Sequence, residues 1–213
     1  MRNKPHVWNE YHDMMTTEFF NVCADKRVIE IAPMAGHQTQ SIVKHTLKSL
    51  TLIEADKKFE SELIDQFPLA TVICDDIFKV YEDTISADVV VSCGLLYHLH
   101  NPFHLLELIV NQSDPEYIIL DSIHPRDKLR ISVDVEQSNT IGNRTSKENW
   151  KCVNYNVVVD FEYVNSALID LGYVCLKNIN LRKFMVETKL NSWMALWKKT
   201  NQNEQIAIAN INQ

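Results

Sequence analysis

The sequence predicts an α/β fold built around a mostly parallel sheet, because short apolar runs alternate with helix-like stretches. The runs are rich in Val and Ile and carry few interspersed polar residues. Such continuous apolar character is typical of strands buried on both faces of a parallel sheet. A repeated strand–helix–strand order implies right-handed βαβ crossovers. The expected strands are residues 27–31, 50–54, 70–74, 88–93 and 117–121, and the expected helices are residues 38–48, 57–66 and 102–110.

The two ends of the chain complete this pattern. Residues 8–23 carry large apolar side chains at steps of three and four, which predicts an amphipathic helix. Residues 161–171 are helix-like and stop at Gly172, a suitable C-terminal cap, and residues 173–181 and 192–198 follow as two closing strands. Between them, short strands around 131–135 and 155–159 flank a loop at 137–149, and the Asn- and Gln-rich residues 200–213 are expected to form a flexible tail.

Composition limits the classes of function. The 213 residues suit one domain, and a net charge of −7 argues against binding a nucleic-acid backbone, although Arg126, Lys128 and Arg130 leave a local basic patch open. The first residues form no apolar signal stretch and no run is long enough to span a membrane, so we expect a cytoplasmic protein. The five cysteines form no CxxC pair, which predicts neither a disulfide framework nor a metal site.

The most informative segments are those that follow the expected strands, since ligands of open parallel sheets bind beyond the carboxyl ends of strands. The first strand runs into Glu30-Ile31-Ala32-Pro33-Met34-Ala35-Gly36. This segment resembles the first motif of class I S-adenosylmethionine (SAM)-dependent methyltransferases, E-x-G-x-G-x-G. Glu30 and Gly36 match it, whereas Ala32 and Met34 replace the first two glycines. Met34 allows a close approach of ligand to backbone only if its side chain points away.

Acids at the next two strand ends extend the resemblance. Glu54, beside Ala55, ends the second strand, where an acid can accept hydrogen bonds from both ribose hydroxyls; a solvated strand-end residue is the alternative. Asp56 is predicted as a helix N-cap. After the third strand the resemblance implies an acid for the adenine amino group and an apolar residue for its ring. Asp76 with Ile77 fits best, Asp75 is the rival, and a solvated acidic turn remains an alternative for either acid.

The fourth strand carries the most specific segment, which runs from Asp88 through Cys93-Gly94-Leu95-Leu96-Tyr97-His98 to Pro102. It is similar to the family pattern D-x-V-x-x-x-G-V-L-Y-H, and in particular to the branch that contains the tRNA-uridine carboxymethyl transferase. The resemblance implies that Cys93, Gly94 and Leu95 line the cofactor, while Tyr97 and His98 point toward the transfer site. Alternatively, His98 is a helix-start histidine that hydrogen-bonds the loop.

The resemblance implies a specific architecture and cofactor. The family fold is a seven-stranded, mostly parallel sheet with helices on both faces and an antiparallel last strand. Residues 26–199 would form the SAM-binding domain, with an insertion at 122–160 and the helix in residues 1–25 capping the pocket. The cofactor would be SAM and its product S-adenosylhomocysteine (SAH). A dinucleotide is disfavoured, because Pro33 and Met34 crowd a turn that would have to cradle a pyrophosphate.

Several residues are candidates for contact with the acceptor. A base is needed only if the acceptor keeps a proton, and His98 is the first candidate and His124 the second. Tyr11, His12, Tyr97 and Trp150 are expected to bind the acceptor, together with His98. The insertion is expected to form a substrate lid, with a homodimer surface as the alternative. A solvated basic face is favoured over an anion site for Arg126, Lys128 and Arg130.

Three functions remain open from the sequence. We expect a methyltransferase acting on a small-molecule acceptor. An RNA-modifying SAM-dependent transferase is the second interpretation, supported by the fourth-strand resemblance and opposed by the acidic composition. The third is a SAM-binding fold without catalysis that serves as a regulatory or scaffold partner, which the replaced glycines keep open.

Overall fold

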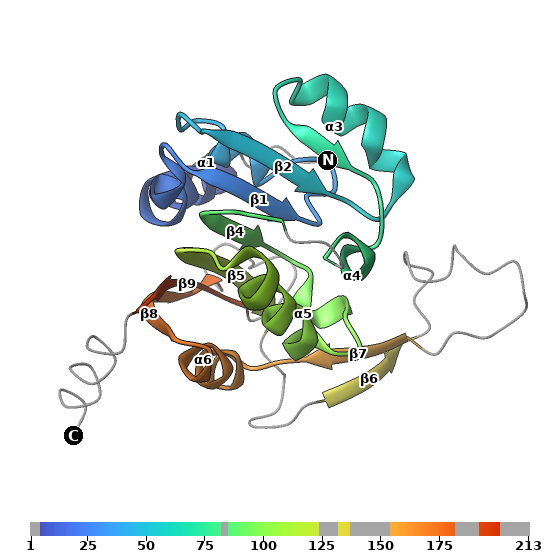
Figure 1. The fold of residues 1–213 in the computed structure, drawn as a ribbon, viewed down its shortest axis with the longest axis vertical. Coiled ribbons are helices and arrows are strands. Elements are labelled where there is room, and N and C mark those ends of the chain that lie inside the picture. Colours follow the sequence, from blue (N-terminus) through green and yellow to red (C-terminus); the bar gives the residue numbers. More distant parts are fainter. Residues whose placement is uncertain (1–4, 82–84, 124–131, 137–153, 182–191, 201–213) are drawn as a thin grey trace, which may run out of the picture.

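The apolar runs of the sequence lie side by side in one seven-stranded sheet. The protein is described here by a computed structural model, which covers residues 5–81, 85–123, 132–136, 154–181 and 192–200 (Figure 1). The sheet order is β3-β2-β1-β4-β5-β9-β8. Its strands are β1 (Arg27–Ile31), β2 (Ser49–Ile53), β3 (Thr71–Ile73), β4 (Val89–Ser92), β5 (Tyr117–Ile123), β8 (Tyr173–Asn180) and β9 (Ser192–Lys199).

The strand directions confirm the expected topology. Strands β1 to β5 pair in parallel, whereas β9 pairs antiparallel with both β5 and β8. The chain moves outward from β1 through β2 to β3 and then returns to β4, beside β1. Strand order therefore reverses between β1 and β4, and their carboxyl ends form the crevice where open α/β sheets bind ligands.

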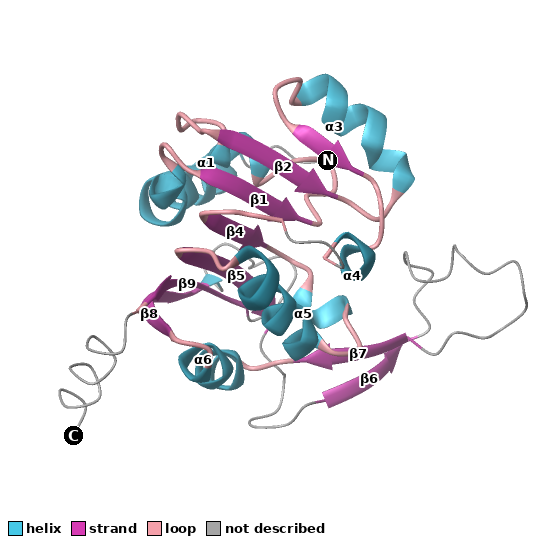
Figure 2. Cartoon of the chain, viewed as in Figure 1, coloured by secondary structure: helices cyan, strands magenta, loops and turns pink. Residues whose placement is uncertain are grey.

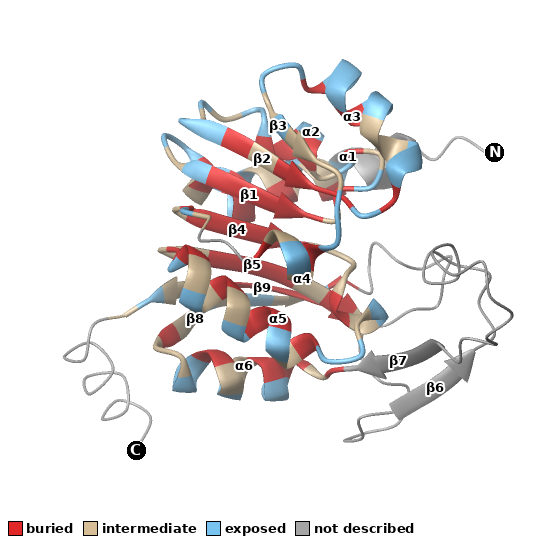
Figure 3. Ribbon diagram, turned by 45° about the vertical axis from the view of Figure 1, so that its right-hand side comes forward, coloured by how far each residue is buried: buried red, intermediate tan, exposed pale blue. Residues whose placement is uncertain are grey.

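Helices cover both faces of the sheet, as predicted (Figure 2). One face packs against α4 (Ile77–Val80), α5 (Pro102–Leu108) and α6 (Phe161–Asp170). The other packs against α1 (Pro5–Met14), α2 (Thr39–Ile42) and α3 (Glu60–Gln66). The central strands are buried between these layers, which explains their continuous apolar sequences (Figure 3).

Short turns of other helix types extend several of these helices. The predicted N-terminal helix continues from α1 through a π-helical turn, η1 (Met15–Phe19), into a 3₁₀ turn, η2 (Phe20–Cys23). The 3₁₀ turn η3 (Lys57–Phe59) precedes α3, and Asp56 caps it by accepting from Lys58 N, as predicted. The 3₁₀ turn η4 (Leu96–His98) follows β4, and the π-helical turn η5 (Ile109–Ser113) continues α5.

Two predictions of local structure need correction. The helix expected at 38–48 is limited to Thr39–Ile42, because the backbone beyond it bonds to a different segment. Asp25 N donates to Thr46 O at 2.7 Å and Lys48 N donates to Lys26 O at 2.9 Å, so this segment cannot continue the helix. The short helix α4 was not predicted, and its four residues are too few to show helical periodicity.

The region between β5 and α6 contains a second, smaller sheet. Strands β6 (Ser132–Glu136) and β7 (Asn154–Val158) pair antiparallel and lie apart from the main sheet, next to α5 in Figure 1. The alternating residues at 131–135 and 155–159 therefore do mark strands. Within the described residues, none of the helices has the length and apolar character needed to cross a membrane.

Candidate functional site

The loop after β1 holds three alternate residues in the left-handed backbone region. Ala32, Met34 and Gly36 have φ angles of 58°, 52° and 77°. These are the three positions at which the resembled motif carries glycine. Only glycine adopts this conformation without steric cost, so the loop keeps the backbone shape of the motif under strain at two positions. Met34 is 50% exposed, so its side chain is not enclosed by the core.

We expect Met34→Gly to stabilise the protein by about 0.5–1 kcal/mol. Relief of a positive φ contributes roughly 1–2 kcal/mol, and the greater freedom of glycine in the unfolded chain offsets part of it. Urea unfolding at constant m value measures the difference. Val43→Gly is the matched control, because Val43 is similarly exposed but has a φ of −73°. If both variants lost stability equally, the loop would not be strained at Met34.

Two buried acidic residues, Glu30 and Glu54, lie next to this loop. Glu30 on β1 accepts a hydrogen bond from Thr39 Oγ1 at 2.6 Å. Burial raises the pKa of Glu30 to about 7, and the charge of Glu54 adds to the increase. Glu54, directly after β2, accepts from Met34 N at 2.9 Å and from Asp56 N at 2.8 Å. Glu54 therefore ties the loop after β1 to the end of β2.

The raised pKa of Glu30 predicts a pH-dependent stability. The folded protein holds a proton on Glu30 up to about pH 7, whereas the unfolded chain releases it near pH 4.5. The contribution of Glu30 to stability should therefore be greatest below about pH 4.5, fall as pH rises toward about 7, and level off above. Glu30→Gln removes this contribution and should gain up to roughly 3 kcal/mol relative to wild type at pH 8. Urea unfolding of both proteins from about pH 5 to about pH 8 tests this prediction. Parallel curves of stability against pH would contradict it.

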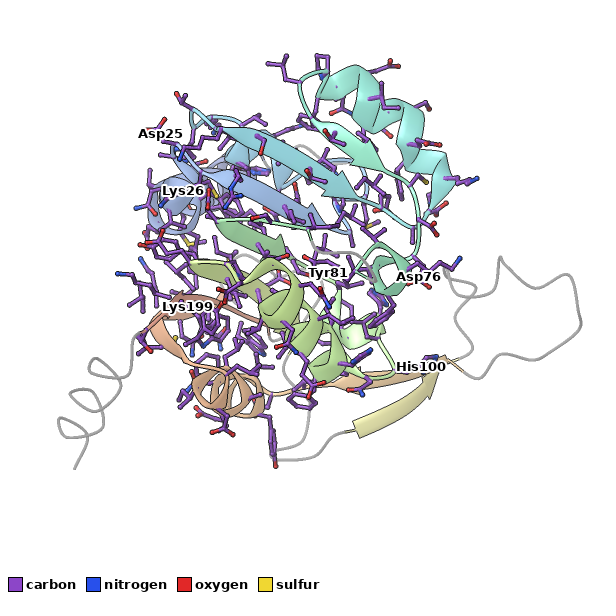
Figure 4. The ribbon with its side chains drawn as sticks, in the orientation of Figure 1. Asp25, Lys26, Asp76, Tyr81, His100 and Lys199 are labelled. Carbon is purple, nitrogen blue, oxygen red and sulfur yellow. The ribbon has the colours of Figure 1, made fainter. Side chains whose placement is uncertain are left out.

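The acids after β3 lie at the same edge of the sheet, and both accept hydrogen bonds from nearby backbone N–H groups. Asp76 Oδ1 accepts from Phe78 N at 2.9 Å and caps α4. Asp75 Oδ1 accepts from Asp76 N at 2.7 Å, and this bond lowers the pKa of Asp75. Both acids are exposed, whereas Ile77 is buried in the core. Figure 4 shows Asp76 at the carboxyl-end edge, opposite Lys26 and Lys199.

The opposite edge of the sheet, at the amino ends of the parallel strands, is closed by ion pairs. Lys26 Nζ lies 2.6 Å from Glu116, and Arg27 lies 2.7 Å from Asp88. The bond from Arg27 holds the pKa of Asp88 at about 2. These ion pairs, with that between Lys199 and Asp114, neutralise several of the charges described at this end of the sheet.

A cavity of about 520 Å³ opens at the carboxyl-end edge, between α1 and the ends of β4 and β5. The residues predicted from sequence contribute to its wall from two segments that are far apart in the chain. The wall consists of Tyr11, His12, His37, Gln38, Cys93, Gly94, Tyr97, Asp121, Ser122, Ile123 and Ser192. The structure thus brings together Tyr11, His12, Cys93, Gly94 and Tyr97, as expected.

Asp121 is the most important residue that the sequence analysis missed. It lies at the wall of the cavity, and Gly94 N donates a hydrogen bond to its Oδ1. Burial raises the pKa of Asp121 to about 7, although the bond from Gly94 works in the opposite direction. An acid at the end of an apolar strand is the signal in the sequence that marks Asp121, whereas the prediction named His124, three residues later.

The histidine expected to act in catalysis lies outside the wall of this cavity. His98 is exposed in η4, its ring centroid lies 4.3 Å from that of Tyr97, and partial desolvation lowers its pKa. His12 and His37 line the cavity instead, and His12 Nδ1 lies 3.0 Å from Ser41 Oγ. His124, Trp150 and the basic group Arg126, Lys128 and Arg130 lie outside the described residues.

The remaining predicted cofactor residues are not among those that line the cavity. Glu54, Asp75 and Asp76 follow the neighbouring strands β2 and β3 at the same edge, so a ligand that reaches both regions would be elongated. Leu95 is half-buried at the start of η4, and Ala55 is exposed beside Glu54. Over the part of the chain that the structure describes, no cluster of His, Cys, Asp or Glu could hold a metal ion.

Comparison with solved structures places this fold. No protein-family model matches the chain. It is similar to the magnesium protoporphyrin IX methyltransferase ChlM of Synechocystis PCC 6803 with bound SAM, with a TM-score of 0.64, 9% identity, and coverage of 94% of this chain and 86% of ChlM. It is similar to the N-methyltransferase NodS of Bradyrhizobium japonicum WM9 in complex with SAH, with a TM-score of 0.64, 14% identity, and coverage of 93% and 90%.

A third similar structure is the SAM-dependent methyltransferase of Mesorhizobium loti, with a TM-score of 0.63, 12% identity, and coverage of 92% of this chain and 99% of that protein. The likeness therefore extends over nearly whole chains in each case. At such low identities it establishes the architecture and leaves the chemistry to the site residues. The chain has the fold of the class I SAM-dependent methyltransferases.

Proposed function

We propose that this protein binds SAM and transfers its methyl group to a small-molecule acceptor. The observation that carries the proposal is the loop after β1. Ala32 and Met34 keep the left-handed backbone that glycine would adopt without cost, and backbone strain of this kind is retained chiefly at functional sites. Nothing in the packing of a plain strand–helix connection requires three alternate residues in this conformation.

The residues around the cavity fit an adenosine-containing cofactor. The Glu54 carboxylate has about four acceptor positions, and two of them accept hydrogen bonds from Met34 N and Asp56 N. Two remain for the ribose hydroxyls, and the existing bonds fix the direction of the carboxylate. Asp76 or Asp75 would accept from the adenine amino group beside Ile77. Glu30, Ala32, Pro33, Gly36, Ala55, Cys93, Gly94 and Leu95 would complete the cofactor site.

When bound, SAM supplies an activated methyl group on a positively charged sulfur. The chain's own residues then have to align the acceptor and exclude water. Tyr11 on α1 is buried at the cavity wall, so residues 1–25 are proposed to cap the pocket. Tyr11, His12, Tyr97, His98 and Trp150 are the proposed acceptor contacts. Residues 122–160 are the proposed lid.

A base is required only for an acceptor that keeps a proton. His98 and His124 remain the proposed bases on grounds of their place in the sequence. A lowered pKa leaves His98 neutral near pH 7 and thus able to accept a proton. His98→Ala and His124→Ala should each be tested for turnover, and unchanged turnover in both would remove these residues from the mechanism.

Transfer of a labelled methyl group tests this function. The purified protein is incubated with SAM that carries a trideuterated methyl group, and with either a low-molecular-mass metabolite extract or total RNA. We expect the label, together with SAH, in the metabolite sample. Label confined to RNA would instead identify an RNA-modifying enzyme. Absence of transfer by a protein that binds SAH would indicate a SAM-binding protein without catalysis.

A further inference from the structure

The charge of the cavity wall is one-sided. Asp121 contributes a carboxylate, and among the residues that the structure describes neither Lys nor Arg lines the cavity. Among the described residues, the hydrogen-bond partner of Asp121 is Gly94 N, and no basic side chain forms an ion pair with it. His12 also lines the cavity, but desolvation lowers its pKa, so it is largely neutral near pH 7. A half-buried acid without a cation favours a ligand that supplies one.

Oxygen atoms without a described partner lie at the wall and can accept hydrogen bonds from a ligand. Ser122 Oγ and Ser192 Oγ are buried, with 1% and 5% of these residues exposed, and neither oxygen has a described partner. Gln38 Nε2 donates to Tyr11 Oη at 2.8 Å, while Gln38 Oε1 is buried without a partner. All three residues line the cavity. Buried polar groups are normally satisfied. Gln38 Oε1 can only accept a hydrogen bond and the Ser192 hydroxyl can accept one, so a ligand that donates hydrogen bonds would satisfy both.

The aromatic residues of the wall suit the same ligand. Tyr97 Oη lies 3.6 Å from the position of a Cβ added at Gly94, and Gly94 N donates to Asp121, so the phenol and the carboxylate are neighbours. Burial, followed by the charge of Asp121, raises the pKa of Tyr97 to about 12. The face of a tyrosine ring attracts a cation, and its edge can pack against carbon atoms of the ligand. An alkylammonium group is a cation with hydrogen-bond donors and no acceptor. It therefore matches the Asp121 carboxylate, the Gln38 and Ser192 oxygens and the tyrosine ring at once.

We infer that the acceptor is an amine, which Asp121 holds beside the cofactor, and that its nitrogen receives the methyl group. This inference rests on the function proposed above. The ammonium form first gives one proton to the Asp121 carboxylate. The nitrogen lone pair then forms a bond to the methyl carbon while the sulfur–methyl bond breaks and its electron pair stays on sulfur. The products are a methylated ammonium, neutral SAH and protonated Asp121, which returns its proton to water.

Matched probes test the charge requirement. Benzylamine is compared with benzyl alcohol, and butylamine with butanol, by calorimetric titration at saturating SAH. We expect each amine to bind at least about tenfold more tightly than its alcohol, since a hydrogen bond to a charged group exceeds a neutral one. Asp121→Asn can still accept from Gly94 N, so it should fold, and it should weaken amine binding about tenfold or more without changing alcohol binding. Glu107→Gln, an exposed acid on α5, is the control.

The outcomes separate this inference from the proposed function. If SAH does not bind the wild type, the proposed function fails and the amine site fails with it. If SAH binds but alcohols bind as tightly as amines, or no amine binds at millimolar concentration, the acceptor is not an amine. If Asp121→Asn weakens SAH binding as much as amine binding, Asp121 holds the amino group of the cofactor, and the acceptor assignment is overturned.

Discussion

Replacement of Gly36 by alanine is expected to destabilise the fold by about 2–4 kcal/mol. An added Cβ would lie 2.3 Å from Phe67 Cε2 and 2.8 Å from Phe67 Cζ, far inside contact distance. Phe67 is buried, with 7% exposed, and Leu63 Cδ2 lies 3.5 Å from the same point, so the ring has little room to move. The φ of 77° adds the cost of a left-handed conformation to the cost of the clash.

Gly94→Ala is the matched control for this experiment. Gly94 has a similar φ of 79°, but an added Cβ would meet nothing nearer than Tyr97 Oη at 3.6 Å. Its expected cost is therefore the backbone term alone, about 1–2 kcal/mol. Combining Gly36→Ala with Phe67→Leu should recover part of the loss by removing the clashing ring atoms. Urea unfolding measures all three, and equal losses for Gly36→Ala and Gly94→Ala would refute the close contact with Phe67.

Replacement of Glu54 by glutamine is expected to weaken SAH binding by about 30- to 100-fold, which corresponds to roughly 2–3 kcal/mol. The proposed ribose hydroxyls would lose a charged acceptor. One amide nitrogen would also face Met34 N or Asp56 N, which are donors themselves, so the loop after β1 would be held less firmly. The lost charge and the weaker hold on the loop should therefore both reduce SAH affinity.

Calorimetric titration with SAH measures this loss. Glu62→Gln is the control, because Glu62 is an exposed acid on α3 whose described partner is Gln66, on the same helix. Urea unfolding of Glu54→Gln confirms that the variant is folded at the temperature of the titration. Unchanged SAH affinity in a folded Glu54→Gln would mean that no ribose reaches this carboxylate.

The sheet could be predicted from the sequence because strands buried on both faces have continuous apolar sequences. Val28, Val90 and Ile119 are buried inside continuous apolar runs, and such runs have few alternative explanations. Helix α2 was predicted too long, because the apolar spacing of residues 38–48 does not reveal that backbone groups at 46 and 48 bond to residues 25 and 26. Competing tertiary hydrogen bonds of this kind are invisible to periodicity.

Residues of the site could be predicted from the sequence only where they belong to a recognisable local motif. Glu30, Glu54 and Gly94 occupy positions that a local pattern marks. Asp121 and Ser192 meet because β9 runs antiparallel beside β5, where Ser192 pairs with Ile123. No spacing in the sequence records that meeting, since the two residues lie on separate segments and each is an ordinary polar residue near a strand end. Their relation becomes visible only when the sheet is assembled.

Calorimetric titration of the wild-type protein with SAM, and separately with SAH, tests the central claim most directly. The loop at residues 32–36, the fixed carboxylate of Glu54 and the adjoining cavity predict saturable one-to-one binding of both compounds. Absence of binding by either compound at millimolar concentration would contradict the account, and the strained loop would then require another explanation.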